Sequence, residues 1–158
     1  MKNQARIDCF LPYSTPEQVQ ATVESLKQQP VVAGIFLLST DPDVPAIEGC
    51  NRINIDSLNS SATMRAIAGA TTADHALLYN KTNRLDLGYL ALERMLRIAA
   101  DTGAGMLYSD YVTETDGKRT NAPTIDYQDG SLRDDFNFGS VILFDSSVLR
   151  FAARELKA

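Results

Sequence analysis

Short runs of apolar residues, separated by polar stretches, recur along the chain. Five of these runs have the length and the boundaries of strands buried within a sheet rather than those of helices. They cover residues 7–11, 32–38, 75–79, 106–108 and 140–144. The pattern therefore predicts five buried strands.

Between these runs, apolar residues recur at the spacing of one helical face. The clearest helix begins at Pro16, after a potential capping residue at Thr15, and buries Val19, Val23 and Leu26. Two further helices are predicted at 61–68, ended by Gly69, and at 88–100, ended by Gly103. A last helix is predicted at 146–157. It would be capped by Asp145 or Ser146, and its inward residues would be Leu149, Ala153 and Leu156.

The strands and helices alternate, which is typical of right-handed crossovers in a mostly parallel sheet. We predict one three-layer α/β domain over residues 1–158, with helices on both faces of the sheet. The alternation breaks after Tyr111, where Asp116-Gly117 is typical of a hairpin turn between 112–115 and 118–120. A polar stretch without periodicity follows at 121–133, and loops of this length are more often functional or mobile than idle.

Charge and composition exclude several classes of protein. The net charge is −5 and no basic stripe is visible, so nucleic acid is not expected as a partner. The apolar runs are far shorter than the ~20 residues of a transmembrane segment, and no secretion signal is visible, so a cytoplasmic location is expected. Cys9, Cys50 and His75 are too scattered for a zinc site, and no Gly-x-Ser-x-Gly motif accompanies the histidine.

Candidate binding residues follow the predicted strands, because ligands of open parallel sheets bind beyond the carboxyl ends of the strands. Pro12, Tyr13 and Ser14 follow the first strand, where the ring could pack on a base and the hydroxyl could bind a ribose or a phosphate. The alternative is an ordinary turn in which Thr15 only caps the next helix. Neither a dinucleotide-binding glycine motif nor a P-loop is present.

Several stretches, taken in order, resemble family 2 glycosyltransferases. The start of the chain resembles theirs, because its first strand ends in proline and its first helix ends in Ser-Leu-x-x-Gln. Further on, Tyr108-Ser109-Asp110 together with Asp116-Gly117-Lys118 resembles a stretch found in many members. The resemblance covers most of the chain, to about Leu149. Its matching segments are 7–13, 16–18, 23–29, 75–79, 90–96, 106–110 and 116–119, with Pro123.

The resemblance implies the single α/β nucleotide-sugar domain called GT-A. It implies transfer of a sugar from a nucleotide-diphosphate donor to a carbohydrate or lipid-linked acceptor, with a carboxylate base taking the acceptor proton. It also implies Mg²⁺ or Mn²⁺, bound with the nucleotide-sugar through an Asp-x-Asp motif. Family members generally continue past residue 158 and carry the base there, so the resemblance favours an N-terminal portion and leaves the catalytic base unassigned.

The sequence departs from the family where the metal motif is expected, because Tyr79-Asn80-Lys81 contains no carboxylate. Lys81 could offset the diphosphate charge in place of a metal, or could be a solvated loop lysine. Asp41 could replace the paired aspartates that bind the base in the family, or could only begin a turn with Asp43.

Two groups of carboxylates remain as candidates. Asp110 ends a strand and is the one residue expected to bind metal, weakly. Asp134 and Asp135 could fold across the same edge, and Arg133 could pair with either of them or with phosphate; the alternative is a solvated loop.

Two other functions stay open at this point. One is a non-catalytic relative that keeps the fold and acts as a binding or assembly module. The other is a nucleotidyltransferase of similar architecture, which would need a glycine- and arginine-rich signature after the first strand that this sequence lacks.

Overall fold

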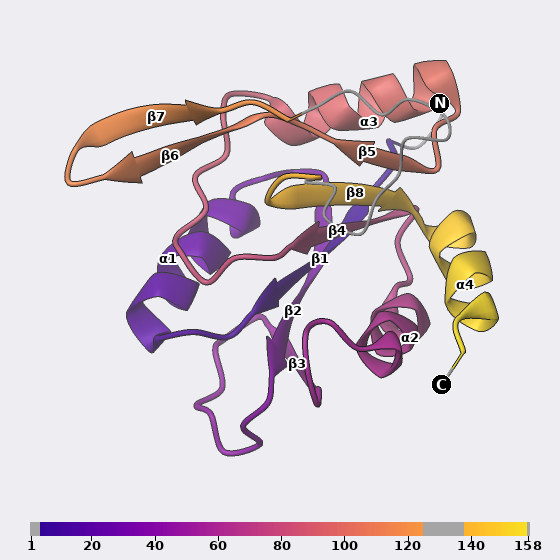
Figure 1. Cartoon of the computed structure of the whole chain (residues 1–158), viewed down its shortest axis with the longest axis horizontal. Helices are drawn as coiled ribbons and strands as arrows, with labels where there is room; N and C mark the ends of the chain where they lie inside the picture. Colours follow the sequence, from indigo (N-terminus) through magenta and orange to yellow (C-terminus); the bar gives the residue numbers. More distant parts are fainter. Residues whose placement is uncertain (1–3, 125–137, 158) are drawn as a thin grey trace.

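A computed structural model describes residues 4–124 and 138–157 of the chain. The described residues form a six-stranded sheet in the order β3-β2-β1-β4-β8-β5 (Figure 1). β3, β2, β1 and β4 pair in parallel, whereas β8 is antiparallel to both β4 and β5. The strands are β1 Ile7–Pro12, β2 Val32–Ser39, β3 Asn51–Asn54, β4 His75–Tyr79, β5 Met106–Tyr108 and β8 Val141–Asp145.

Helices cover both faces of this sheet. α1 (Pro16–Lys27) and α3 (Ala91–Thr102) bury their apolar faces in one core, and α2 (Ser61–Ala70) and α4 (Ser146–Glu155) bury theirs in another. In Figure 1, α1 accordingly lies on the opposite side of the central strands from α2 and α4. The predicted three-layer α/β fold with a mostly parallel sheet is confirmed.

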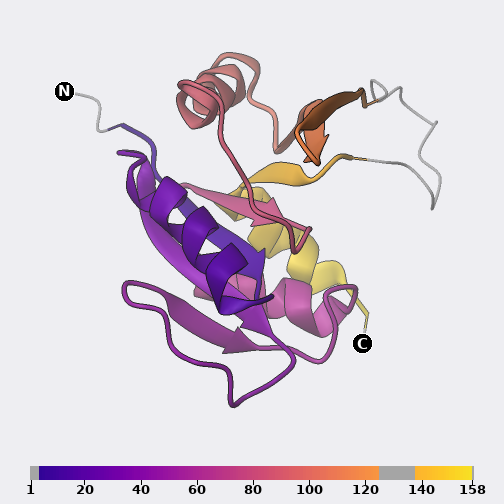
Figure 2. The same cartoon turned by 90° about the vertical axis from the view of Figure 1, so that its left-hand side faces the viewer.

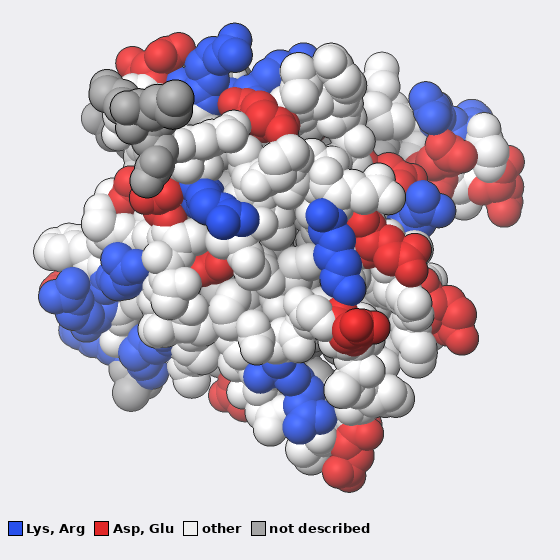
Figure 3. Space-filling model, turned by 180° about the vertical axis from the view of Figure 1, so that it is seen from behind, with Lys and Arg blue, Asp and Glu red and all other residues white. Residues whose placement is uncertain are grey.

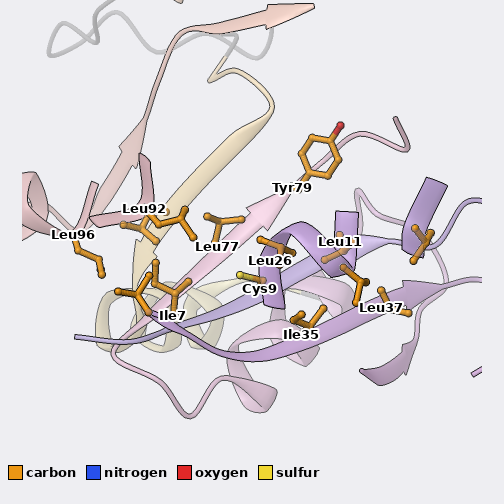
Figure 4. Close-up of a cluster of buried hydrophobic side chains, with 14 residues drawn as sticks. Ile7, Cys9, Leu11, Leu26, Ile35, Leu37, Leu77, Tyr79, Leu92 and Leu96 are labelled. Carbon is orange, nitrogen blue, oxygen red and sulfur yellow. The ribbon is translucent and has the colours of Figure 1, made fainter. Parts of the chain in front are cut away.

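β1 separates the two cores, because alternate side chains of a strand point to opposite faces. Ile7, Cys9 and Leu11 enter the larger core (Figure 4), and Phe10 enters the smaller one, where its ring stacks on Phe36 at a centroid distance of 4.7 Å. Burial, with a smaller contribution from the neighbouring Asp8, raises the pKa of the Cys9 thiol to about 12. Cys9 is therefore an inert part of the core.

A two-stranded hairpin projects away from the sheet (Figures 1 and 2). It consists of β6 (Tyr111–Thr115) and β7 (Lys118–Ala122), and all of its strand residues except Tyr111 and Ala122 are exposed. Asp116 and Gly117 form the turn with φ of 51° and 75°, the left-handed region that tight hairpin turns require. The predicted hairpin turn is confirmed.

Two local predictions are wrong, and a third is confirmed only in part. Gly69 does not end α2, because the Thr71 N–H still donates to the Ile67 carbonyl one turn back. Leu156 is 39% exposed and lies just beyond the end of α4. The side chain of Thr15 makes no capping hydrogen bond to α1, although it occupies the capping position.

Candidate functional site

The segments that follow β1, β2, β4 and β5 meet at one edge of the sheet, where β8 also begins. The Tyr13 N–H donates to the Leu38 carbonyl at the end of β2, and the Asn80 N–H donates to the Ser140 carbonyl just before β8. We call this the carboxyl edge. His75 begins β4 and therefore lies at the opposite edge, away from the candidate binding residues.

The residues after β1 hold two buried hydroxyl groups. Pro12 is buried, and the connection from β1 to α1 consists of residues 13–15 alone. The ring of Tyr13 packs against the larger core. The hydroxyl oxygens of Tyr13 and Ser14 are both shielded from solvent, and neither has a hydrogen-bond partner among residues 4–124 and 138–157. Such pairs of unsatisfied buried groups are uncommon in folded proteins.

The residues after β4 contribute an amide and a cation. The Asn80 side-chain amide donates to the Gly139 carbonyl at 3.1 Å, which fastens the end of β4 to the chain entering β8. Lys81 is exposed and makes no hydrogen bond or ion pair within the described ranges 4–124 and 138–157. The Tyr79 hydroxyl, which points away from the apolar cluster in Figure 4, donates to the Asn83 carbonyl at 2.8 Å. Burial raises the pKa of this hydroxyl.

A crevice is lined by the end of β1, by α1 and by the end of β4 with the segment that follows it. Ser14 and Lys81 both line it, although they are far apart in sequence. The interior is too narrow for a water molecule, so a ligand reaches the shielded Ser14 hydroxyl only if the crevice widens. The other lining residues are Leu11, Pro12, Gln18, Val19, Thr22, Tyr79, Thr82 and Asn83.

Asp41, after β2, is held in a local turn. Its Oδ1 accepts from the Asp43 N–H at 2.9 Å, and the Ser39 hydroxyl donates to its carbonyl at 2.8 Å. These contacts are those of the turn that is the alternative to base binding. Its side chain is exposed, and a contact with a base stays a prediction.

Asp110, after β5, borders a hollow of about 400 Å³ lined by residues 106–110 and Thr124. Its Oδ1 accepts from the Thr124 N–H at 2.7 Å and from the Thr124 hydroxyl at 2.8 Å. These two hydrogen bonds lower the pKa of the Asp110 carboxyl. No sequence pattern indicates Thr124 or the Asn80 contact, since both depend on where the chain returns towards β8.

The described residues offer no ready metal site. Within 4–124 and 138–157, no three His, Cys, Asp or Glu side chains come together closely enough to bind an ion. Arg133, Asp134 and Asp135 lie outside the described residues, so their predicted roles stay predictions.

The distribution of charge on the surface and the length of the helices are relevant to the partners that the protein could bind. On the face seen in Figure 3, lysines and arginines are interspersed with acidic residues and form no continuous basic stripe. None of the helices in the described part of the chain is long and apolar enough to cross a membrane.

Solved structures of similar fold are known, although no family model and no curated protein matches the chain. One is the CMP:2-keto-3-deoxy-manno-octonic acid synthetase complexed with CTP, with a TM-score of 0.62 at 13% identity, covering 98% of this chain and 80% of that one. Another is 2-C-methyl-D-erythritol 4-phosphate cytidylyltransferase from Thermus thermophilus, with a TM-score of 0.58 at 13% identity over 95% and 78% of the two chains.

A glycosyltransferase matches over a smaller part. The mannosyltransferase from Pyrobaculum calidifontis, in complex with GDP-Man and Mn²⁺, has a TM-score of 0.50 at 8% identity. The match covers 68% of this chain, which spans about a third (36%) of that protein. At these identities the likeness establishes the fold, and this chain has the α/β fold of the nucleotide-diphospho-sugar transferases.

Proposed function

We propose that this chain binds a nucleotide-diphosphate sugar at its carboxyl edge and serves as the donor domain of a glycosyltransferase. The observation that carries the proposal is the pair of buried hydroxyls of Tyr13 and Ser14, which have no partner in the described part of the chain. An unsatisfied buried hydroxyl costs about 1–3 kcal/mol, and a ligand with hydrogen-bonding groups would remove that cost. Both residues follow β1 at the edge where ligands of such sheets bind.

The connection after β1 favours a sugar nucleotide over a nucleoside triphosphate. It holds only Tyr13, Ser14 and Thr15, with no glycine or arginine to wrap a triphosphate chain. A nucleotidyltransferase is nevertheless the second candidate, because two of the solved structures of similar fold are a CMP-sugar synthetase and a cytidylyltransferase. A binding experiment separates the two.

In the proposed reaction, the bond between the anomeric carbon of the sugar and the diphosphate oxygen breaks, and the diphosphate keeps the electron pair. A new bond forms between that carbon and a hydroxyl oxygen of the carbohydrate or lipid-linked acceptor, whose proton passes to a base. The described residues hold the donor in this proposal, and the base is left unassigned.

Calorimetry with UDP-glucose, GDP-mannose and CTP tests the proposal. We expect one of the sugar nucleotides to bind, and Ser14→Ala to weaken that binding about 3- to 10-fold through the loss of one hydrogen bond. Ser25→Ala, in α1 and away from the crevice, is the control and should leave the affinity unchanged.

The other outcomes are equally informative. Binding of CTP without binding of either sugar nucleotide would favour the nucleotidyltransferase. If no nucleotide binds, the proposal is wrong and a non-catalytic binding or assembly module becomes the better description.

A further inference from the structure

The position after β4 is where the resemblance to family 2 glycosyltransferases implies a metal motif, and the side chains there do not suit one. Mg²⁺ and Mn²⁺ favour anionic oxygen ligands. Asn80 supplies a neutral amide that is already engaged with Gly139, and the next residue, Lys81, carries a positive charge. A cation beside the site would repel a divalent ion.

We infer that Lys81 neutralises the diphosphate of the donor, so that donor binding at this edge needs no divalent metal. This inference rests on the proposed function, since it concerns how the same ligand is held. A lysine ammonium is a compact positive charge with three donors and is a common phosphate ligand in proteins.

The surroundings of Lys81 support this role. It lines the crevice together with Ser14, whose hydroxyl lacks a partner, and with Thr82, which brings a second hydroxyl. The exposed ammonium of Lys81 and the exposed hydroxyl of Thr82 are donors that a phosphate oxygen accepts from, and Ser14 adds a third donor once a ligand reaches its shielded hydroxyl.

Three acidic side chains in the described segments that follow β2, β4 and β5 already have partners. Asp86 pairs with Arg84 at 3.0 Å, the Oδ1 atom of Asp110 accepts from Thr124, and that of Asp41 accepts from Asp43. Within the described residues, no carboxylate lies within ion-pair distance of the Lys81 ammonium. As far as these residues are concerned, its charge is therefore available to a ligand.

The test compares ligands with and without phosphate. Binding of UDP-glucose and GDP-mannose, and of uridine and guanosine, is measured with EDTA and with Mn²⁺ for the wild type and for Lys81→Ala. We expect EDTA to leave sugar-nucleotide binding unchanged. Lys81→Ala should weaken it about 10-fold or more, as expected for a lost charge-assisted hydrogen bond, while nucleoside binding changes less than about 2-fold.

Two further variants separate charge from structure. Lys81→Arg should restore most of the affinity, and Lys118→Ala, at an exposed lysine of the hairpin, is the matched control and should have no effect. Sugar-nucleotide binding that is lost in EDTA, or that survives Lys81→Ala, would overturn the inference while the proposed function stands. If the wild type binds no nucleotide under either condition, the proposed function fails and this inference fails with it.

Discussion

The buried hydroxyl of Tyr13 makes opposite predictions for stability and for binding. Because this oxygen has no partner among the residues that the structure describes, Tyr13→Phe removes an unsatisfied polar atom and should raise the free energy of unfolding by about 1 kcal/mol. The same change should weaken binding of the sugar nucleotide. Urea denaturation and calorimetry measure the two effects, and Tyr89→Phe, at a side chain 88% exposed, serves as the control. A destabilised Tyr13→Phe would show that the hydroxyl is already paired.

Asp8 is a second residue whose role is set by its contacts, and here the role is structural. It is 2% exposed, and its Oδ2 accepts from the N–H groups of Thr72 and Ala73 at 2.8 and 3.0 Å, which holds the chain entering β4. On β2 only a glycine fits beside it, because a Cβ at Gly34 would lie 2.8 Å from Asp8 Oδ1.

We expect Asp8→Ala to lower the free energy of unfolding by about 3 kcal/mol, because two charge-assisted hydrogen bonds are lost. Gly34→Ala should also destabilise the fold, since the added methyl collides with the carboxylate. Denaturant unfolding measures both changes, with Asp101→Ala at the exposed end of α3 as the control. An unchanged midpoint for Asp8→Ala would contradict this account.

At the scale of the element, α4 depends on its capping residue. Asp145 accepts from the Ser147 hydroxyl and from the N–H groups of Ser147 and Val148, and these bonds lower the pKa of its carboxyl. Asp145→Ala should therefore cost about 1 kcal/mol at neutral pH.

The pH dependence of this cap follows from the direction in which folding shifts the pKa of Asp145. A carboxyl whose pKa is lowered by folding stabilises the protein above its unfolded-state pKa of about 3.9 and loses that contribution as the pH falls through its folded-state pKa. The difference in unfolding free energy between the wild type and Asp145→Ala should stay level from about pH 7 to about pH 5 and shrink as the pH falls below about 3.9. A difference that does not shrink in acid would show that the ionised form is not what caps the helix.

The elements also differ in how far the sequence can predict them. The central strands are predicted to within a residue at each end, because a strand buried on both faces is a continuous apolar run. β3 is not predicted, because it is an edge strand in which Ile53 stands among exposed polar residues. The antiparallel direction of β8 is not predictable either, since an apolar run has the same pattern in either direction.

The site is predictable only in part, for a related reason. Strand ends locate the segments at Tyr13, Lys81 and Asp110, but not the contacts that they make. The partners of Asn80 and Asp110 are Gly139 and Thr124, which are distant in sequence and have no local pattern of their own. Position 139 has no room for a side chain, because a Cβ there would lie 2.9 Å from the Ser109 carbonyl oxygen.

At the scale of the whole molecule, the protection of backbone amides against hydrogen exchange should decrease from the central strands to the projecting hairpin. β1 is buried along its whole length between β2 and β4, whereas β6 and β7 pair only with each other in the described structure. We expect hydrogen exchange to be slowest for the amides of β1 and fast for those of the hairpin. Hairpin amides protected as strongly as those of β1 would mean that another surface covers the hairpin.

The position of β8 has a consequence for the order in which the chain is completed during synthesis. β5 is synthesised before the hairpin, but in the described sheet it pairs with β8, which begins more than thirty residues later. β8 also pairs with β4. Until residues 141–145 leave the ribosome, β5 lacks the strand that it pairs with in the described sheet, and the side of β4 that β8 covers stays open. The N-terminal strands can assemble as they emerge, because β1, β2 and β4 pair with one another directly. The sheet therefore closes late, when a C-terminal strand inserts between two that are already made.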